Sequence, residues 1–99
     1  MMKLRINPLV AKDLKSIKDY IAEDNADKAL ETVQEIYHQF ENIQQFPYIG
    51  AGLSKRVSFK TDYKYVVWED YVVLYKVVKE AVEIYRVVNR YQDITRIFE

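Results

Sequence analysis

The spacing of apolar residues changes once along this chain, and that change limits the fold more than any other feature. Before residue 47, apolar side chains recur every three or four positions, which is typical of helices packed against a core. After residue 54 they recur at every second position, which is typical of strands. The segment between, Pro-Tyr-Ile-Gly-Ala-Gly-Leu-Ser, holds both glycines of the chain and one of its two prolines. We therefore expect helices first and a sheet second.

Two amphipathic helices are predicted in the first half of the chain. The first begins at Asn7-Pro8, because Asn caps helices and Pro fits their first position, and it runs to about residue 23. Its apolar stripe is Val10, Leu14, Ile17 and Ile21. The second begins after Asp24-Asn25 and ends near Phe46, before Pro47. Its stripe is Ala26, Ala29, Val33, Ile36, Phe40 and Ile43. The very short link between them predicts an antiparallel helix hairpin.

Short strands are predicted on both sides of this hairpin. Residues 3–7 alternate and form the first candidate. The candidates after the loop are residues 56–59, 63–68, 72–78 and 82–88, separated by turns at Glu69-Asp70 and near Lys79-Glu80. Short connections make these neighbours antiparallel. Residues 90–98 favour a last turn or a short helix, anchored by Ile94, Ile97 or Phe98.

Together these elements predict one α+β domain over residues 1–99. Its N-terminal strand and antiparallel helix hairpin would pack on a small antiparallel sheet, in the order β-α-α-β-β-β. At 99 residues and 49% hydrophobic content, the chain can bury a real core. The hairpin covers only one face of the sheet, yet residues 72–78 are apolar on both faces. The other face must meet the tail, a partner chain or solvent, and if exposed it would be an interaction surface.

Several kinds of chemistry are excluded by composition. The chain has no cysteine, which removes disulfides, cysteine-ligated zinc and thiol chemistry. The one histidine, His38, points away from the apolar stripe of its helix, so a surface role is expected and no hydrolase triad is available. No phosphate-binding glycine loop, transmembrane run or signal peptide is visible. We therefore expect a cytoplasmic protein with no metal, no cofactor and no membrane partner.

Basic residues of the second half are the candidate functional groups, although fifteen basic and fifteen acidic residues cancel overall. Arg86 lies among apolar neighbours of a strand, where a charge is costly unless paired or used. An ion pair, for example with Glu69 or Asp93, and a phosphate-directed role are equally supported for it. The remaining candidates lie in two stretches, Arg56, Lys60 and Lys64, and Asn89, Arg90 and Tyr91.

Each of these two stretches also has a plain interpretation. Arg56, Lys60 and Lys64 are charges of the kind that protect an edge strand, and that interpretation is favoured when they are taken alone. Arg90 and Tyr91 could stack on a base and hold a phosphate, although a packed tail tyrosine is commoner.

Three segments resemble one known family. They are "INPLVAKDLKSIKDYIAEDN", "FPYIGAGL" and "VVLYKVVKEAVEIYRVVNRYQDITRIF". With the order of elements, they are similar to the RelE/ParE toxin superfamily of bacterial type II toxin–antitoxin systems, nearer its ParE-like branch. The resemblance covers nearly the whole chain. Arg86, Val87 and Asp93 match the closing motif of that branch, whereas Asn89 stands where a His is common and Tyr91-Gln92 replaces the usual basic pair.

This resemblance implies a growth-inhibiting toxin that is neutralised by a cognate antitoxin, which would wrap over the helix hairpin and the apolar sheet surface. RelE-like members are mRNA interferases that cut mRNA in the ribosomal A site. In that case the resemblance assigns Arg56 and Arg86 to the scissile phosphate and Tyr91 to stacking or proton transfer. Lys60, Lys64, Asn89 and Arg90 would then bind the target.

ParE-like members instead poison DNA gyrase by binding, and they are not known to cleave nucleic acid themselves. The partners implied are thus the antitoxin and either the ribosome with mRNA or DNA gyrase. A degenerate, non-toxic relative that only binds a partner is a third alternative. The oligomeric state stays open.

Overall fold

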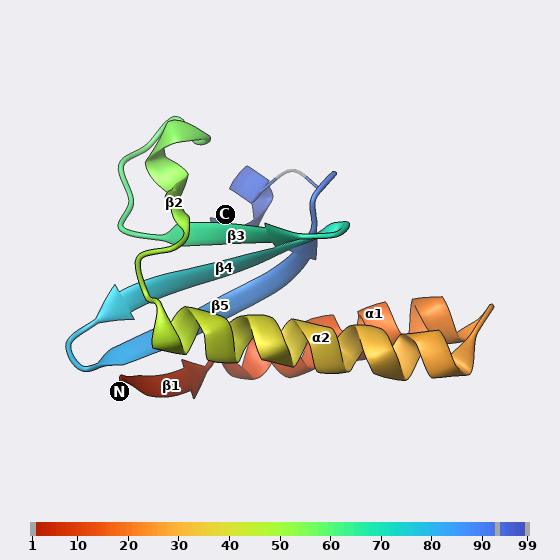
Figure 1. Ribbon diagram of the computed structural model, residues 1–99. Coiled ribbons are helices and arrows are strands. Elements are labelled where there is room, and N and C mark those ends of the chain that lie inside the picture. Colours follow the sequence, from red (N-terminus) through yellow and green to blue (C-terminus); the bar gives the residue numbers. More distant parts are fainter. Residues whose placement is uncertain (1, 93, 99) are drawn as a thin grey trace.

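The computed structural model describes residues 2–92 and 94–98 and has the expected α+β fold (Figure 1). The helix hairpin is formed by α1 (Pro8–Ala22) and α2 (Ala26–Gln45). The strands are β1 (Lys3–Ile6), β2 (Ala51–Gly52), β3 (Lys64–Trp68), β4 (Tyr71–Val78) and β5 (Ala81–Asn89). Two short 3-10 helices complete the elements, η1 (Leu53–Lys55) and η2 (Ile94–Phe98). No helix of the described ranges is long and apolar enough to cross a membrane.

Asparagine caps start both helices, as the sequence predicts. The side chain of Asn7 accepts a hydrogen bond from the Leu9 amide at 2.9 Å, and Pro8 occupies the first turn. The side chain of Asn25 accepts from the Lys28 amide at 3.0 Å. These contacts satisfy amides that have no partner within the helix itself. The link between the caps is so short that α1 and α2 lie side by side as an antiparallel hairpin (Figure 1).

The described strands form a mixed sheet with the order β1-β5-β4-β3-β2. The pairs β2–β3, β3–β4 and β4–β5 are antiparallel, as expected from their short connections. β1 instead lies parallel to β5, with Lys3 opposite Ala81 and Ile6 opposite Ile84. The expected antiparallel sheet therefore gains a parallel edge. Its cause is the route of the chain, because β1 and β5 are not neighbours in sequence and the helix hairpin lies between them.

Both faces of the sheet are covered, one by the hairpin and one by the second half of the chain. The hairpin face buries Val10, Leu14, Ile36, Phe40 and Ile43 against Val73, Tyr75, Val82, Ile84 and Val87. On the other face Leu53, Val72, Leu74 and Val88 are buried. They lie under Val57 from the segment after η1, and under Ile94 and Ile97 from the tail. Of the three covers that the sequence allowed for this face, the tail is confirmed.

Residues 56–59, predicted as a strand, do not form one. The chain makes the short helix η1 and then turns and bends through this segment. Val57 is half-buried against the second core, whereas Phe59 is exposed. Four alternating residues are too few to decide between a strand and a loop with one apolar anchor. The strand that pairs with β3 is the two-residue β2, which lies earlier in the chain.

Tyr75 fixes the loop that joins α2 to β2. Its side chain is fully buried, and its hydroxyl donates to the Pro47 carbonyl at 2.8 Å. The same hydroxyl accepts from the Gly50 amide at 2.9 Å. A Cβ atom at Gly50 would lie 2.5 Å from that hydroxyl oxygen, so only glycine fits. Burial raises the pKa of Tyr75 above its ordinary value, and the Gly50 amide lowers it by a smaller amount.

Candidate functional site

Arg86, the central candidate from the sequence, forms an ion pair with Asp13 of α1. Its Nε and one terminal nitrogen donate to the two carboxylate oxygens, each at 2.8 Å. The exposed fractions are 24% for the Arg86 side chain and 10% for Asp13. The hydrogen bond from Arg86 to Asp13 raises the pKa of Arg86 further above its already high value. The ion-pair interpretation is therefore right in kind, but the partner is Asp13 rather than Glu69, and Asp93 lies outside the described residues.

Asp13 occupies the edge of β5 at the point where β1 has ended. One of its carboxylate oxygens also accepts from the backbone amide of Val87 at 3.0 Å. β1 covers β5 only as far as Ile84, so the edge beyond it needs another acceptor. The carboxylate thus joins α1 to β5 through both main chain and side chain. This geometry directs the guanidinium of Arg86 to a partner within the fold.

Arg56 and Lys64 each lie beside a tyrosine, and Lys64 is the first residue of β3. Arg56 Nε donates to the Tyr65 hydroxyl at 2.8 Å, and its guanidinium carbon lies 5.0 Å from the centre of that ring. Lys64 Nζ lies 5.7 Å from the centre of the Tyr48 ring. Lys60 is exposed nearby in sequence. This end of the sheet therefore presents cations next to partly exposed aromatic rings, an arrangement that suits anionic or aromatic ligands.

Asn89, Arg90 and Tyr91 follow the end of β5. The Asn89 side chain accepts from the Tyr91 amide at 2.9 Å, so it organises the turn. The Arg90 amide donates to the Asp70 carbonyl at 2.8 Å, and its guanidinium lies 5.7 Å from the Tyr91 ring. Tyr91 is 79% exposed. The packed alternative for Tyr91 is therefore wrong, and this ring stands in solvent beside a cation.

The structure separates these two groups instead of bringing them together. Lys64 begins β3 and Trp68 ends it, a distance of about 13 Å for four steps along a strand. Trp68 pairs with Tyr71, which pairs with Asn89 in the next strand. The Arg56 segment and the Tyr91 segment thus lie at opposite ends of β3 (Figure 1). The residues assigned to one catalytic set occupy three places.

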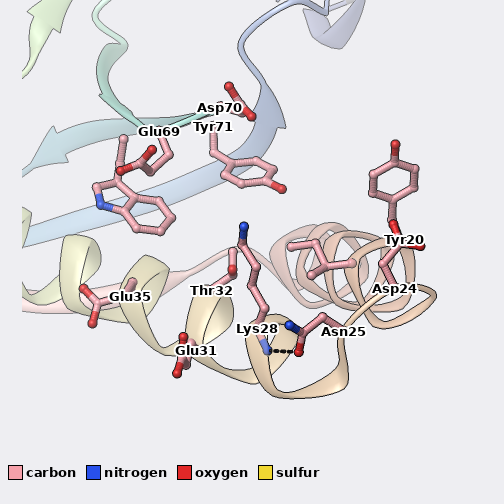
Figure 2. Close-up of a pocket in the computed structure, with 12 residues that line it drawn as sticks. Tyr20, Asp24, Asn25, Lys28, Glu31, Thr32, Glu35, Glu69, Asp70 and Tyr71 are labelled. Atoms are coloured by element: carbon pink, nitrogen blue, oxygen red, sulfur yellow. Dashed lines mark hydrogen bonds between the residues drawn. The ribbon is translucent and has the colours of Figure 1, made fainter.

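A groove that sequence reasoning missed lies between the hairpin and the β3–β4 turn (Figure 2). Its volume is about 590 Å³. Its lining residues come from the end of α1, the first turns of α2 and the turn: Tyr20, Ile21, Asp24, Asn25, Lys28, Glu31, Thr32, Glu35, Trp68, Glu69, Asp70 and Tyr71. The sequence carried one signal for it, because Trp68-Glu69-Asp70-Tyr71 places aromatic and acidic residues together in a turn.

Comparison with known proteins identifies the family. No curated protein matches the chain. A solved structure described as the chromosomal ParDE TA system from P. aeruginosa matches with a TM-score of 0.75 and 28% sequence identity, covering 90% of this chain and 96% of the other. The family model for the ParE toxin of the type II toxin-antitoxin system, parDE, matches residues 4–94. With the strand–hairpin–sheet fold already described, this match shows that the chain belongs to the ParE toxin family of type II toxin–antitoxin systems.

Proposed function

We propose that this toxin stops growth by binding DNA gyrase in the cytoplasm, without cleaving nucleic acid itself, and that a cognate antitoxin neutralises it. The chain is a type II toxin component by its family. The sequence resemblance to the ParE-like branch supports gyrase as the target. The P. aeruginosa structure, which is described as a ParDE TA system, supports an antitoxin as the second partner.

The observation that carries this proposal is the separation of the residues assigned to RNA cleavage. Cleavage through a 2′-hydroxyl needs a base, an acid and a cation within hydrogen-bond reach of one phosphate. Arg56 and Tyr91 lie at opposite ends of β3, and the guanidinium of Arg86 is bound to Asp13. Surface cations without a common centre are better suited to binding than to catalysis.

The two mechanisms differ in what happens to nucleic acid after the toxin is induced without its antitoxin. A gyrase poison should leave mRNA 5′ ends unchanged, relax plasmid DNA and block supercoiling by purified gyrase. New 5′ ends at a fixed position within translated codons would contradict the proposal and establish cleavage in the ribosomal A site. Co-expression of the antitoxin should restore growth under the first outcome. A toxin that fails to inhibit growth at all would point to a degenerate binding module.

The variant Tyr91→Phe distinguishes RNA cleavage from gyrase binding, because it removes a single oxygen atom. It keeps the exposed ring beside Arg90 and removes only the hydroxyl. Proton transfer by a positioned side chain contributes about 10²- to 10⁴-fold to a rate, so RNA cleavage that depends on this hydroxyl would collapse. We expect Tyr91→Phe to inhibit growth as strongly as the natural toxin. The measurement is colony formation after induction, with protein levels matched by immunoblot.

A further inference from the structure

The groove between the hairpin and the β3–β4 turn has an aromatic wall and a polar wall. Trp68 and Tyr71 form the aromatic wall, with ring centres 6.4 Å apart and an angle of 20° between the ring planes. The opposite wall is made by Lys28 and Thr32 of α2 together with Ile21 of α1. Stacked rings of this kind present an electron-rich face, which attracts a cationic side chain.

Acidic residues surround these walls from three elements. They are Asp24 after α1, Glu31 and Glu35 on α2, and Glu69 and Asp70 in the turn. Lys28 is the one basic residue that lines the groove among the described residues. Five carboxylates against one ammonium give the groove a negative potential, although the chain as a whole has a net charge of zero.

Thr32 shows that the groove has room for a polar ligand. Thr32 is 8% exposed and lines the groove. Figure 2 shows the hydroxyl directed toward the space between α2 and the turn. A threonine hydroxyl can donate one hydrogen bond and accept others. This hydroxyl is therefore available to a donor group of a ligand in the groove.

Lys28 indicates the charge of that ligand. Its side chain extends between Thr32 and Tyr71 (Figure 2), and no carboxylate of the described residues lies within ion-pair distance of its amine. A long cationic side chain therefore fits the space between the two walls. Because this internal ammonium is not fixed by an ion pair, a guanidinium from another molecule can replace it. A planar guanidinium would also stack on the rings, which an ammonium does less well.

We propose that this groove binds a basic segment of the antitoxin, with an arginine side chain placed between the Trp68–Tyr71 wall and Thr32. Charge complementarity favours a basic partner. Tyr20 at the rim of the groove is 74% exposed. A stably bound partner would bury this aromatic ring, because aromatic side chains are enriched in protein interfaces. This inference rests on the proposed function, because it takes the antitoxin as the occupant.

The groove contains the only tryptophan of the chain, so its occupation can be measured directly. We expect a capped tetra-arginine peptide to change the fluorescence of Trp68 saturably, at low ionic strength, in the full-length toxin. A capped tetra-glutamate peptide should have no effect. The absence of a saturable change with tetra-arginine would overturn the proposal.

Two variants test the charge argument, and their expected effects on binding are opposite. Glu35→Gln with Glu69→Asn removes one charge from each side of the groove, and Asn tolerates the left-handed backbone of residue 69, where φ is 51°. We expect it to weaken tetra-arginine binding about tenfold, since charge-assisted contacts are the strong ones. Lys28→Gln should strengthen binding, because it removes the competing cation.

The matched control is Glu41→Gln with Glu80→Asn. Glu41 also lies on α2 and Glu80 also has a left-handed backbone, with φ of 62°, but neither lines the groove. This control should bind the peptide like the natural toxin. Equal weakening in the control and in the Glu35/Glu69 variant would overturn the proposal, because it would reflect general charge and not the groove.

The same variants then identify the occupant. The dissociation constant of the purified toxin–antitoxin complex should follow the same order, with weaker binding for Glu35→Gln/Glu69→Asn and tighter binding for Lys28→Gln. Equal antitoxin affinity in all variants would overturn the assignment of the antitoxin as occupant. Growth inhibition without antitoxin should be unchanged throughout. Absence of growth inhibition by the natural toxin would instead count against the proposed function. Failure of the proposed function can therefore be distinguished from failure of the groove assignment.

Discussion

Asp13 receives three hydrogen bonds, two from the guanidinium of Arg86 and one from the amide of Val87. The sequence shows that Arg86 needs a partner, because a charge inside an apolar strand is costly. It could not show which partner, since Asp13 lies 73 residues away and belongs to another element. Glu69 was one example of a partner that the sequence offers, and only the fold excludes it in favour of Asp13. A single residue can thus show that its charge needs a partner, whereas the identity of that partner depends on the fold.

Asp13→Ala should destabilise the protein strongly. It leaves both the guanidinium and the Val87 amide without their acceptor, at a site where Arg86 is only 24% exposed. We expect the free energy of unfolding to fall by about 2–4 kcal/mol in urea titrations. The control Asp19→Ala breaks the exposed ion pair with Lys15 and should change nothing measurable. A similarly small effect of Asp13→Ala would contradict the assigned role.

Ionisation of one buried and two half-buried tyrosines should set the alkaline limit of stability. Burial raises the pKa of Tyr75 above its ordinary value, and also the pKa values of Tyr63 and Tyr71. The unfolded chain therefore ionises first, so this contribution is complete below about pH 10 and is lost as pH rises further. Urea titrations from pH 7 to pH 11 should show that loss. Tyr75→Phe should reduce it, whereas a curve that is flat to pH 11 would refute this account.

At the scale of elements, the helices were predictable and some strands were not. The apolar stripes of α1 and α2 repeat over several turns, and an asparagine cap marks the start of each helix. Periodicity and capping therefore predict the same helices. Residues 56–59 offered only four alternating positions, and Val57 anchors a loop there instead. The parallel position of β1 was also beyond prediction, because local pattern contains no information about a partner strand near the other end of the chain.

The two tight turns of the sheet hold Glu69 and Glu80 in a strained left-handed backbone conformation, and a substitution can relieve this strain. Glu80 lies between β4 and β5 with φ of 62°, a region that disfavours side chains with a Cβ atom. Glu80→Gly should therefore raise the free energy of unfolding by roughly 0.5–1 kcal/mol. Glu83→Gly is the matched control, because this residue lies inside β5 and should instead lose stability. Destabilisation by Glu80→Gly would show that the turn holds no strain.

At the scale of the whole molecule, two small cores share one sheet. The hairpin covers one face, and the segment after η1 and the tail cover the other. The sequence showed that both faces are apolar and thus that two covers are needed. The candidate site was less predictable, because its residues were identified one by one and the structure distributes them over both ends of β3 and the contact between α1 and β5. The groove, built from three elements, was invisible for the same reason.

Removing the tail contact should open the second core. Ile94→Ala with Ile97→Ala takes two partly buried side chains off the face formed by Val72, Leu74 and Val88. We expect a loss of roughly 2–4 kcal/mol in the free energy of unfolding and binding of a dye that reports exposed apolar surface. Leu30→Ala is a suitable control because that side chain is 52% exposed. Unchanged stability would mean that the tail does not close this face.

The parallel pairing of β1 with β5 also dictates an order of events during synthesis. β1 leaves the ribosome long before its partner strand, Ala81–Asn89. Contacts between such distant segments cost the most loop entropy and form slowly. A nascent chain can make its helix hairpin early, yet its sheet stays without this edge until β5 has emerged. For a toxin component, this late closure of the sheet delays completion of the fold until β5 has been made.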